Sequence, residues 1–203
     1  MTKSSDLIDS LEVYVLNNPA EVKPHWVSHF IVPTANELLI KIKNKDGNSG
    51  FGLATSYTDI KPIIKPFSNG LQDLIIGEDP FCPERLYEKI FNLTDTRTSN
   101  EKRWSKEALI RISAALDIAC WDLIGKASKM PLYKLFGGYR NKIPVYVTCA
   151  YYRDGKDETE LRQELKKLID IGHQSFKVKV GGLSIKEDAK RLEIIRQEIG
   201  NDK

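Results

Sequence analysis

The sequence predicts an α+β domain, with an antiparallel sheet followed by helices, that continues into alternating strands and helices of a parallel sheet. Three features support this: short strands joined by turn residues before residue 60, a long helix with an apolar stripe before residue 130, and two strand–helix pairs after residue 143. With 203 residues, 41% of them hydrophobic, the chain has enough apolar material for one or two cores.

The N-terminal part has the pattern of antiparallel strands. Residues 11–16 and 37–43 are rich in branched apolar residues, and the second of these stretches alternates at its end. Residues 46–50 supply Asp, Gly and Asn for a turn, so residues 51–54 can return as a hairpin partner. We expect an irregular loop over residues 17–36, which carries His25, Trp26 and His29.

The middle of the chain is predicted to be helical. A helix with proline in its first turn is expected over residues 83–91, and the polar residues 94–103 are expected to form a loop. Ser105 can cap a long helix that ends near residues 126–128, because Pro131 forbids its continuation. Its apolar residues recur at helical spacing, and the alanines beside them allow close approach of a neighbouring element.

The last sixty residues have the pattern of parallel β-α-β structure. Strands are expected over residues 143–150 and 175–180, separated by an amphipathic helix over residues 157–171 that stops at Gly172. Ser184 and Glu187 have capping-box spacing and predict the start of another helix. Strand, helix, strand and helix joined by short loops indicate parallel pairing.

Lys177 and Lys179 are the most informative polar pair. Side chains alternate along a strand, so the two lysines share one face, about 6.5–7 Å apart, while Phe176 and Val178 share the other. If helices cover the Phe/Val face, two ammonium groups on the opposite, inner face need an anion. On an edge strand, the same pattern would be a solvated face that blocks edge pairing. Spacing alone leaves both interpretations open.

Two stretches carry a family resemblance. Residues 114–126 (AALDIACWDLIGK) and 131–138 (PLYKLFGG) resemble the signature of the mandelate racemase/muconate lactonizing family of the enolase superfamily. Ile112 and Cys120 depart from the usual small or aliphatic residues but keep apolar side chains. Further similarity lies in residues 47–54, 77–86 and 176–181. Taken together, these matches favour the inner-face interpretation of the two lysines.

The resemblance implies a fold and a reaction. It implies an N-terminal capping domain over residues 1–142 and the truncated start of a (β/α)8 barrel over residues 143–203. Such enzymes bind a carboxylate substrate to Mg²⁺ and remove the proton α to it, as racemases, cycloisomerases or sugar-acid dehydratases; the enolase superfamily is among the general examples of this chemistry. Lys179 resembles the catalytic acid/base. Lys177 resembles its neighbour, which helps neutralise the substrate carboxylate and disfavours protonation of the base.

The resemblance also suggests where substrate would be contacted. The family's counterpart of the loop at residues 17–36 closes over the substrate, so His25, Trp26 and Tyr57 are candidate substrate-binding residues, against the alternative that they are surface residues. Asp117 and Asp122 lie five residues apart and do not share a helix face well, so we do not interpret them as metal ligands. Asp122 is instead expected to pair with Lys126, four residues on.

The sequence ends before the expected metal site. In the family, the three Mg²⁺ ligands and the second acid/base come from later barrel strands, beyond Lys203. We therefore expect a fragment of a longer enzyme, homo-oligomeric when full length, and a 203-residue chain that alone neither binds Mg²⁺ tightly nor turns over its small carboxylate substrate. The alternatives are a non-catalytic short protein that uses the cap fold as a binding module, or an unrelated α/β binding domain.

Composition argues against several other functional classes. The formal net charge of +3 is spread over interspersed acidic and basic residues, which does not indicate nucleic-acid binding. Neither a membrane-spanning apolar stretch nor a signal peptide is recognisable. Cys82, Cys120 and Cys149 are odd in number and far apart, so we expect reduced, buried thiols and a cytoplasmic protein.

Overall fold

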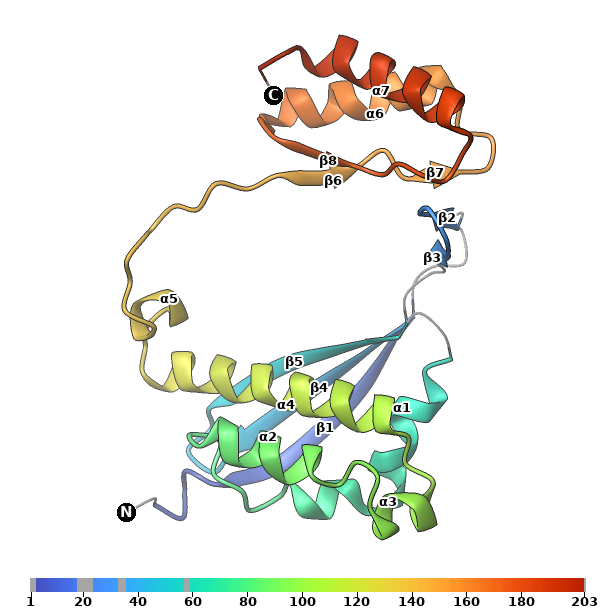
Figure 1. The fold of residues 1–203 in the computed structure, drawn as a ribbon. Coiled ribbons are helices and arrows are strands. Elements are labelled where there is room, and N and C mark those ends of the chain that lie inside the picture. The colour runs from blue at the N-terminus through green and yellow to red at the C-terminus, as the bar shows by residue number, and fades with distance from the viewer. Residues whose placement is uncertain (1–2, 18–23, 33–35, 57–58, 203) are drawn as a thin grey trace. The chain divides into compact units, whose positions relative to one another are not determined.

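The computed structural model describes residues 3–17, 24–32, 36–56 and 59–202 (Figure 1). The chain divides into two compact units, which we call the first unit (Met1–Asn18 and Ala35–Asn141) and the second unit (Pro19–Thr34 and Lys142–Lys203). The predicted domain limits, 1–142 and 143–203, assign residues 19–34 to the capping domain, whereas this division groups them with the second unit.

The first unit contains a three-stranded antiparallel sheet. Its strands are β1 (Ile8–Asn17), β4 (Asn36–Asn44) and β5 (Ser49–Ser56), in the order β1-β4-β5. Gly47, with φ of +86°, forms the tight turn between β4 and β5. The predicted strands and their hairpin are therefore confirmed.

The first unit also contains helices, the longest of which packs against this sheet. They are α1 (Lys61–Pro66), α2 (Pro83–Phe91), α3 (Arg97–Lys102), α4 (Lys106–Ala127) and α5 (Leu132–Leu135), with short irregular turns η1 (Phe67–Leu71) and η2 (Gln72–Leu74) after α1. Ser105 caps α4 as predicted, because its side chain accepts the Ala108 backbone N–H.

One prediction in this region is wrong. The stretch 94–103 is not a loop throughout, because α3 forms within it. The Thr96 side chain accepts the Ser99 backbone N–H at the start of α3, and Arg103, with φ of +54°, ends it. This six-residue polar helix has no apolar stripe, so its sequence carries no periodic signal.

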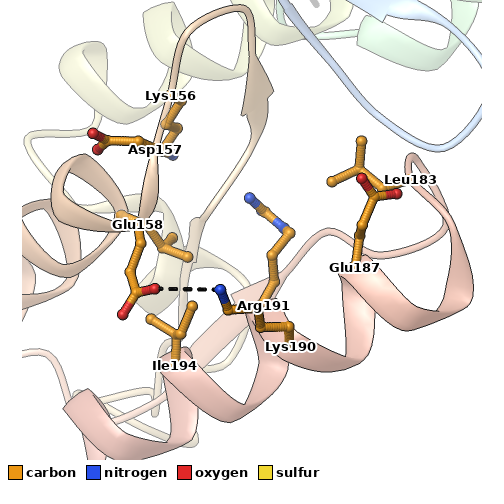
Figure 2. A pocket seen from close by; sticks show the side chains of 9 residues that line it. Lys156, Asp157, Glu158, Leu183, Glu187, Lys190, Arg191 and Ile194 are labelled. Atoms are coloured by element: carbon orange, nitrogen blue, oxygen red, sulfur yellow. Dashed lines mark ion pairs between the residues drawn. The ribbon is translucent and has the colours of Figure 1, made fainter.

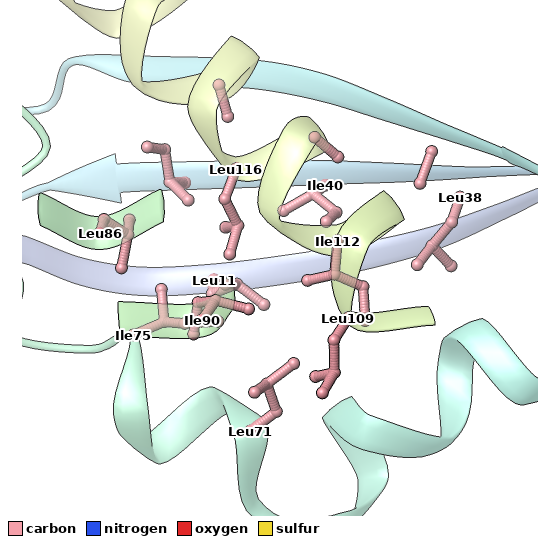
Figure 3. Close-up of a cluster of buried hydrophobic side chains, with 14 of the residues drawn as sticks. Leu11, Leu38, Ile40, Leu71, Ile75, Leu86, Ile90, Leu109, Ile112 and Leu116 are labelled. Atoms are coloured by element: carbon pink, nitrogen blue, oxygen red, sulfur yellow. The ribbon is translucent and has the colours of Figure 1, made fainter. Parts of the chain in front are cut away.

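The core of the first unit lies between its sheet and α4 (Figure 3). Leu38 and Ile40, two positions apart on β4, are fully buried, as are Leu109, Ile112 and Leu116 on α4. The strand presents every second residue to the helix and the helix presents every third or fourth, so the two periodicities meet in one core.

Two glycines allow α4 to approach β5 closely. A Cβ built on Gly52 would lie 1.8 Å from the carbonyl oxygen of Ala115, and one built on Gly50 would lie 1.9 Å from that of Ala119. No side chain fits at such distances. The prediction that the alanines of this helix permit close approach of a neighbour is confirmed.

The second unit contains a parallel β-α-β arrangement. Strands β6 (Val147–Cys149) and β8 (Phe176–Val178) pair in parallel, joined through α6 (Glu158–Ile171), and α7 (Ile185–Ile199) follows. Gly172 ends α6 in a left-handed conformation, and the Ser184–Glu187 capping box starts α7. These features confirm the prediction, although both strands are shorter than expected.

A second small sheet also lies in this unit. It pairs β2 (His25–Trp26) with β3 (Ile31–Val32) and with β7 (Tyr152–Arg153), in the order β3-β2-β7. The segment predicted as an irregular loop therefore contains a short hairpin that hydrogen-bonds to the chain just after β6. We call residues 25–32 the hairpin.

Apolar burial in the second unit is modest. Its cluster of buried residues comprises Cys149, Ala150, Leu161, Leu165, Ile194, Ile195 and Ile199. Within the described residues of both units, no helix has the length and apolar character required to cross a membrane.

Candidate functional site

Lys177 lies in β8 and Lys179 directly follows this strand. Phe176 and Val178 pack against the buried cluster of the second unit, so this strand turns its apolar face to the helices. Lys177 is exposed and Lys179, just after the strand, is partly exposed. Within residues 3–17, 24–32, 36–56 and 59–202, neither lysine forms an ion pair with a carboxylate. Both ammonium groups can therefore receive an anionic ligand.

Each lysine lies over an aromatic ring. The Nζ atom of Lys177 is 5.7 Å from the ring centroid of Tyr146, and that of Lys179 is 5.3 Å from the ring centroid of Tyr151. At these distances the electron-rich ring face attracts the ammonium group. The two tyrosines thus orient the lysines without neutralising them.

The hairpin brings His25 to the same place. The ring of Tyr151 makes an edge contact with the ring of His25, with centroids 4.6 Å apart, so His25 and Lys179 share one aromatic neighbour. Burial, and then the positive charge of Lys156, lower the pKa of His25. The imidazole is therefore a neutral donor or acceptor at pH 7.

Trp26 is held by Tyr152, the first residue of β7. Its ring stacks on that of Tyr152, with centroids 5.9 Å apart, and Tyr152 is buried. Of the residues predicted for the site, the structure thus brings His25, Trp26 and Lys179 around the pair Tyr151–Tyr152, with Lys177 further back beside Tyr146. Tyr57 lies outside the described residues.

The Lys156 side chain holds the backbone next to this cluster. The Lys156 side chain is 7% exposed and forms an ion pair with Glu164, and its Nζ donates to the carbonyl oxygen of Tyr151 at 3.0 Å. Glu164 also accepts the backbone N–H of Ala150 at 2.9 Å. Ala150 has φ of +54°, uncommon for a residue with a side chain. These contacts fix the backbone where the chain leaves β6.

Sequence reasoning missed three residues of this region: Tyr151, Tyr152 and Asp188. The two tyrosines directly follow a predicted parallel strand, and that end of a strand carries functional side chains in α/β folds, so position alone could have indicated them. Asp188 lies inside a helix and reaches Tyr152 across 36 positions. Nothing in the sequence pattern indicates that contact.

The described residues do not provide a metal site. No group of three His, Cys, Asp or Glu side chains among them could hold a metal ion. Asp117 interacts with the Trp121 side chain, and burial, followed by the charge of Glu84, raises the pKa of its carboxyl. Asp122 accepts the Phe51 backbone N–H at 2.9 Å and pairs with Lys126 at 2.6 Å, as predicted for this pair.

A cavity of about 210 Å³ lies between the beginning of α6 and α7 (Figure 2). Its lining mixes charged and apolar side chains, and Lys190 and Glu158 form an ion pair of 3.8 Å there. None of the predicted site residues lines it. Lys156 and Arg191, which contact Tyr151 and Tyr152, do line it.

Comparison with known proteins identifies the family. Residues 10–137 match the family model described as "Mandelate racemase / muconate lactonizing enzyme, N-terminal domain". The chain belongs to this family. The match covers the whole of α4, including Asp122, which accepts a hydrogen bond from the backbone of β5.

Individual members of the family extend the comparison. The chain is similar to the arabinonate dehydratase of Saccharolobus solfataricus, at 32% identity over 80% of this chain and 42% of that protein. It is also 32% identical to the L-Ala-D/L-Glu epimerase of Clostridium acetobutylicum, over 88% of this chain and 46% of that protein.

A solved structure is also similar to this chain. It is a mandelate racemase/muconate lactonizing enzyme from a marine actinobacterium in complex with magnesium, with a TM-score of 0.70 and 27% identity over 97% of this chain and 50% of that one. The chain spans about half the length of the relatives it matches.

Proposed function

We propose that this chain supplies part of an active site that removes the proton α to a carboxylate, with Lys179 as acid/base and Lys177 as its cationic neighbour. Family membership supports the reaction class, because the relatives include a sugar-acid dehydratase and an epimerase. We further propose that the residues after Phe176 correspond to the end of the second strand of a (β/α)8 barrel, the end at which active sites of that fold lie.

The observation that carries the proposal is the environment of Lys179. It follows the last residue of a parallel strand whose apolar face packs against helices, it lies over Tyr151, and no carboxylate among the described residues pairs with it. A lysine on a solvated edge would not need an aromatic partner or a neighbouring hairpin. This arrangement favours a functional amine over a solubilising one.

The chemistry assigned to Lys179 is proton transfer. Its neutral amine takes the α-proton and becomes an ammonium, while the electron pair left by the C–H bond moves into the carboxylate as an enediolate. Lys177 attracts the substrate carboxylate through its positive charge. Neither step needs a carboxylate from this chain.

We propose that His25 and Trp26 contact the substrate. Both lie on the hairpin next to Tyr151 and Tyr152, and Lys179 lies over the ring of Tyr151. A neutral imidazole and an indole can each offer one hydrogen bond and an apolar surface, which suits a small carboxylate with a polar side group. Tyr57 remains a proposed third contact.

We propose that the whole protein uses Mg²⁺ whose ligands lie outside the described residues. The magnesium complex of a family member supports the metal. The acidic residues described in this chain do not form a ligand set, so every step assigned to this chain involves its lysines and its hairpin.

The test is exchange of the α-proton in deuterated water. The whole gene product that contains this chain is incubated with dipeptides and with sugar acids, and deuterium at the α-carbon is followed by NMR. Replacing Lys179 with Ala should lower exchange by at least about a hundredfold, the lower limit for general acid–base catalysis. Lys186→Ala, on the exposed first turn of α7, is the matched control and should retain exchange.

The competing function is a binding module. It predicts no exchange with any carboxylate tested, and equal behaviour of the Lys179 and Lys186 variants. Exchange that survives in Lys179→Ala would assign the base elsewhere and reject the proposal.

A further inference from the structure

The turn that follows Lys179 is held by two side chains from other elements. The backbone N–H of Gly181 donates to Oδ2 of Asp188 at 2.7 Å, and that of Gly182 donates to the Tyr152 hydroxyl at 3.2 Å. The hydroxyl itself donates to Oδ1 of Asp188 at 2.6 Å. Asp188 and Tyr152 therefore form a closed network with the two amides. We call this network the clamp.

The clamp leaves no room for side chains in the turn. A Cβ built on Gly182 would lie 2.5 Å from the Tyr152 ring. Gly181 has φ of +86°, and a Cβ there would lie 3.3 Å from the side chain of Ser28 in the hairpin. The turn thus passes closely between β7 and the hairpin, and its position is set on both sides.

Stabilisation of α7 does not explain why the Asp188 carboxylate is buried, because this helix is already capped. Ser184 and Glu187 form a complete capping box at the start of α7, so the helix does not need a further acceptor. The Asp188 side chain is buried, and an ionised carboxylate loses hydration when buried. Burial alone raises the pKa of Asp188, but hydrogen bonds from Tyr152, Gly181 and Leu183 and the charge of Arg191 hold it below its ordinary value.

Tyr152 extends the clamp to the hairpin and to β6. Trp26 stacks on the Tyr152 ring, and the guanidinium carbon of Arg191 lies 4.4 Å from its centroid. Arg191 also donates through Nη2 to the carbonyl oxygen of Ala150 at 2.9 Å. One buried phenol therefore contacts the lysine-bearing strand end, the hairpin and, through Arg191, the end of β6.

We propose that Tyr152 and Asp188 are positioning residues that fix the turn after Lys179, and thereby hold the Lys179 amine over Tyr151 in register with the hairpin. The proposal rests on the proposed acid/base function of Lys179. Buried polar pairs of this kind can select one arrangement of the chain at some cost in stability. In this case the selected feature is the direction of the Lys179 side chain.

The experiment uses NMR of the 203-residue chain. Its readouts are the exchange rates of the Gly181 and Gly182 amides and the ring-current shift that Tyr151 imposes on the ε protons of Lys179. Tyr152→Phe removes one oxygen and keeps the ring that stacks on Trp26; Asp188→Asn removes the charge. Tyr139→Phe and Asp170→Asn, both at exposed positions, are the matched controls.

We expect the Gly182 amide in Tyr152→Phe and the Gly181 amide in Asp188→Asn to exchange about tenfold faster or more, because each loses a buried or charge-assisted hydrogen bond. The Lys179 shift should move toward the value of a free lysine. The shift of Lys177, which reports on Tyr146, should stay, because the clamp does not touch that end of the strand. The controls should change neither lysine.

Two results would overturn the proposal. One is an unchanged Lys179 shift in Tyr152→Phe while the amides of α6 and α7 stay protected. The other is an equal loss at Lys177 and Lys179, which indicates general loosening of the second unit. If Asp188→Asn does not fold, Tyr152→Phe decides. Absence of α-proton exchange in the whole gene product, with these shifts observed, would reject the proposed function and leave the clamp standing.

Discussion

Different kinds of interaction stabilise the two units of the chain. Among the described residues, the first unit buries a cluster of 21 apolar residues between one sheet and its helices, whereas the corresponding cluster of the second unit has seven. Both units contain buried polar side chains, but in the second unit Asp188, Tyr152 and Lys156 are linked to backbone atoms near the candidate site. The first unit therefore relies more on apolar burial, whereas polar contacts of the second unit position the backbone around the candidate site.

The contrast between the units reflects the different properties of apolar burial and polar contacts. Apolar burial contributes roughly 25 cal/mol per Å² and is non-directional, so it stabilises the first unit without specifying the direction of any polar group. A buried carboxylate contributes little net stability, because desolvation opposes its hydrogen bonds. It does, however, accept bonds only from defined directions. In the second unit, such directional contacts hold the turn that follows Lys179.

The largest expected effect is on the core of the first unit. Replacing Leu116 with Ala removes a fully buried side chain and should lower the free energy of unfolding by about 2–5 kcal/mol. Ile118, on the same helix but 51% exposed, is the matched control and should cost less than about 1 kcal/mol as Ala. Hydrogen exchange of the α4 amides measures both. Equal losses in the two variants would contradict the assigned core.

An intermediate effect is expected from acid. The pKa of Asp188 is lowered in the folded state, so its contribution to stability is present above the ordinary aspartate pKa of about 3.9 and is lost as pH falls through the lower folded value. The pKa of Asp117 in the first unit is raised, so its contribution has the opposite sign: it is present at low pH and lost as pH rises.

Lowering the pH from 7 to 3 should therefore weaken α7, which carries Asp188, more than α4, which carries Asp117. Hydrogen exchange corrected for the intrinsic rate, compared for peptides of α7 and α4, measures this difference. Asp188→Asn, which cannot titrate, should reduce it. If acid weakens both helices equally, Asp188 does not carry the pH dependence.

The smallest expected effect is a difference in alkylation rate between the cysteine thiols of the two buried clusters. Burial raises the pKa of Cys120 to about 12 and that of Cys149 to about 11, with contributions from nearby carboxylates in both cases. The thiolate is the reactive form, so partly exposed Cys82 should be alkylated first, Cys149 of the second unit next and Cys120 last. Mass spectrometry of timed samples gives the order, and Cys120 reacting before Cys149 would mean that the first unit opens more easily.

Much of the fold was predictable from the sequence, because its elements are specified locally. Alternation predicted the β4–β5 hairpin, and the caps at Ser105 and Ser184 predicted where two helices begin. Helix α3 was missed because its polar sequence has no periodic signal. The hairpin at residues 25–32 was missed because two-residue strands are held by β7, which is far away in the sequence.

The candidate site was predictable only in part, for the same physical reason. Strand alternation placed Lys177 and Lys179 on the face away from the helices, and the family resemblance drew attention to His25 and Trp26. Tyr152 and Asp188 act through a contact between β7 and α7, and only the tertiary structure brings these elements together. Local pattern therefore indicates which side chains could do chemistry, and not which residues hold them in place.

The most direct test of the account is a crystal structure of the whole gene product with a bound dipeptide or sugar acid. We predict that the ligand carboxylate lies beside Lys177 and that the Lys179 Nζ atom faces the α-carbon, with Tyr152 and Asp188 still bonded to the turn. A ligand bound away from β8, with both lysines pointing into solvent, would contradict the account.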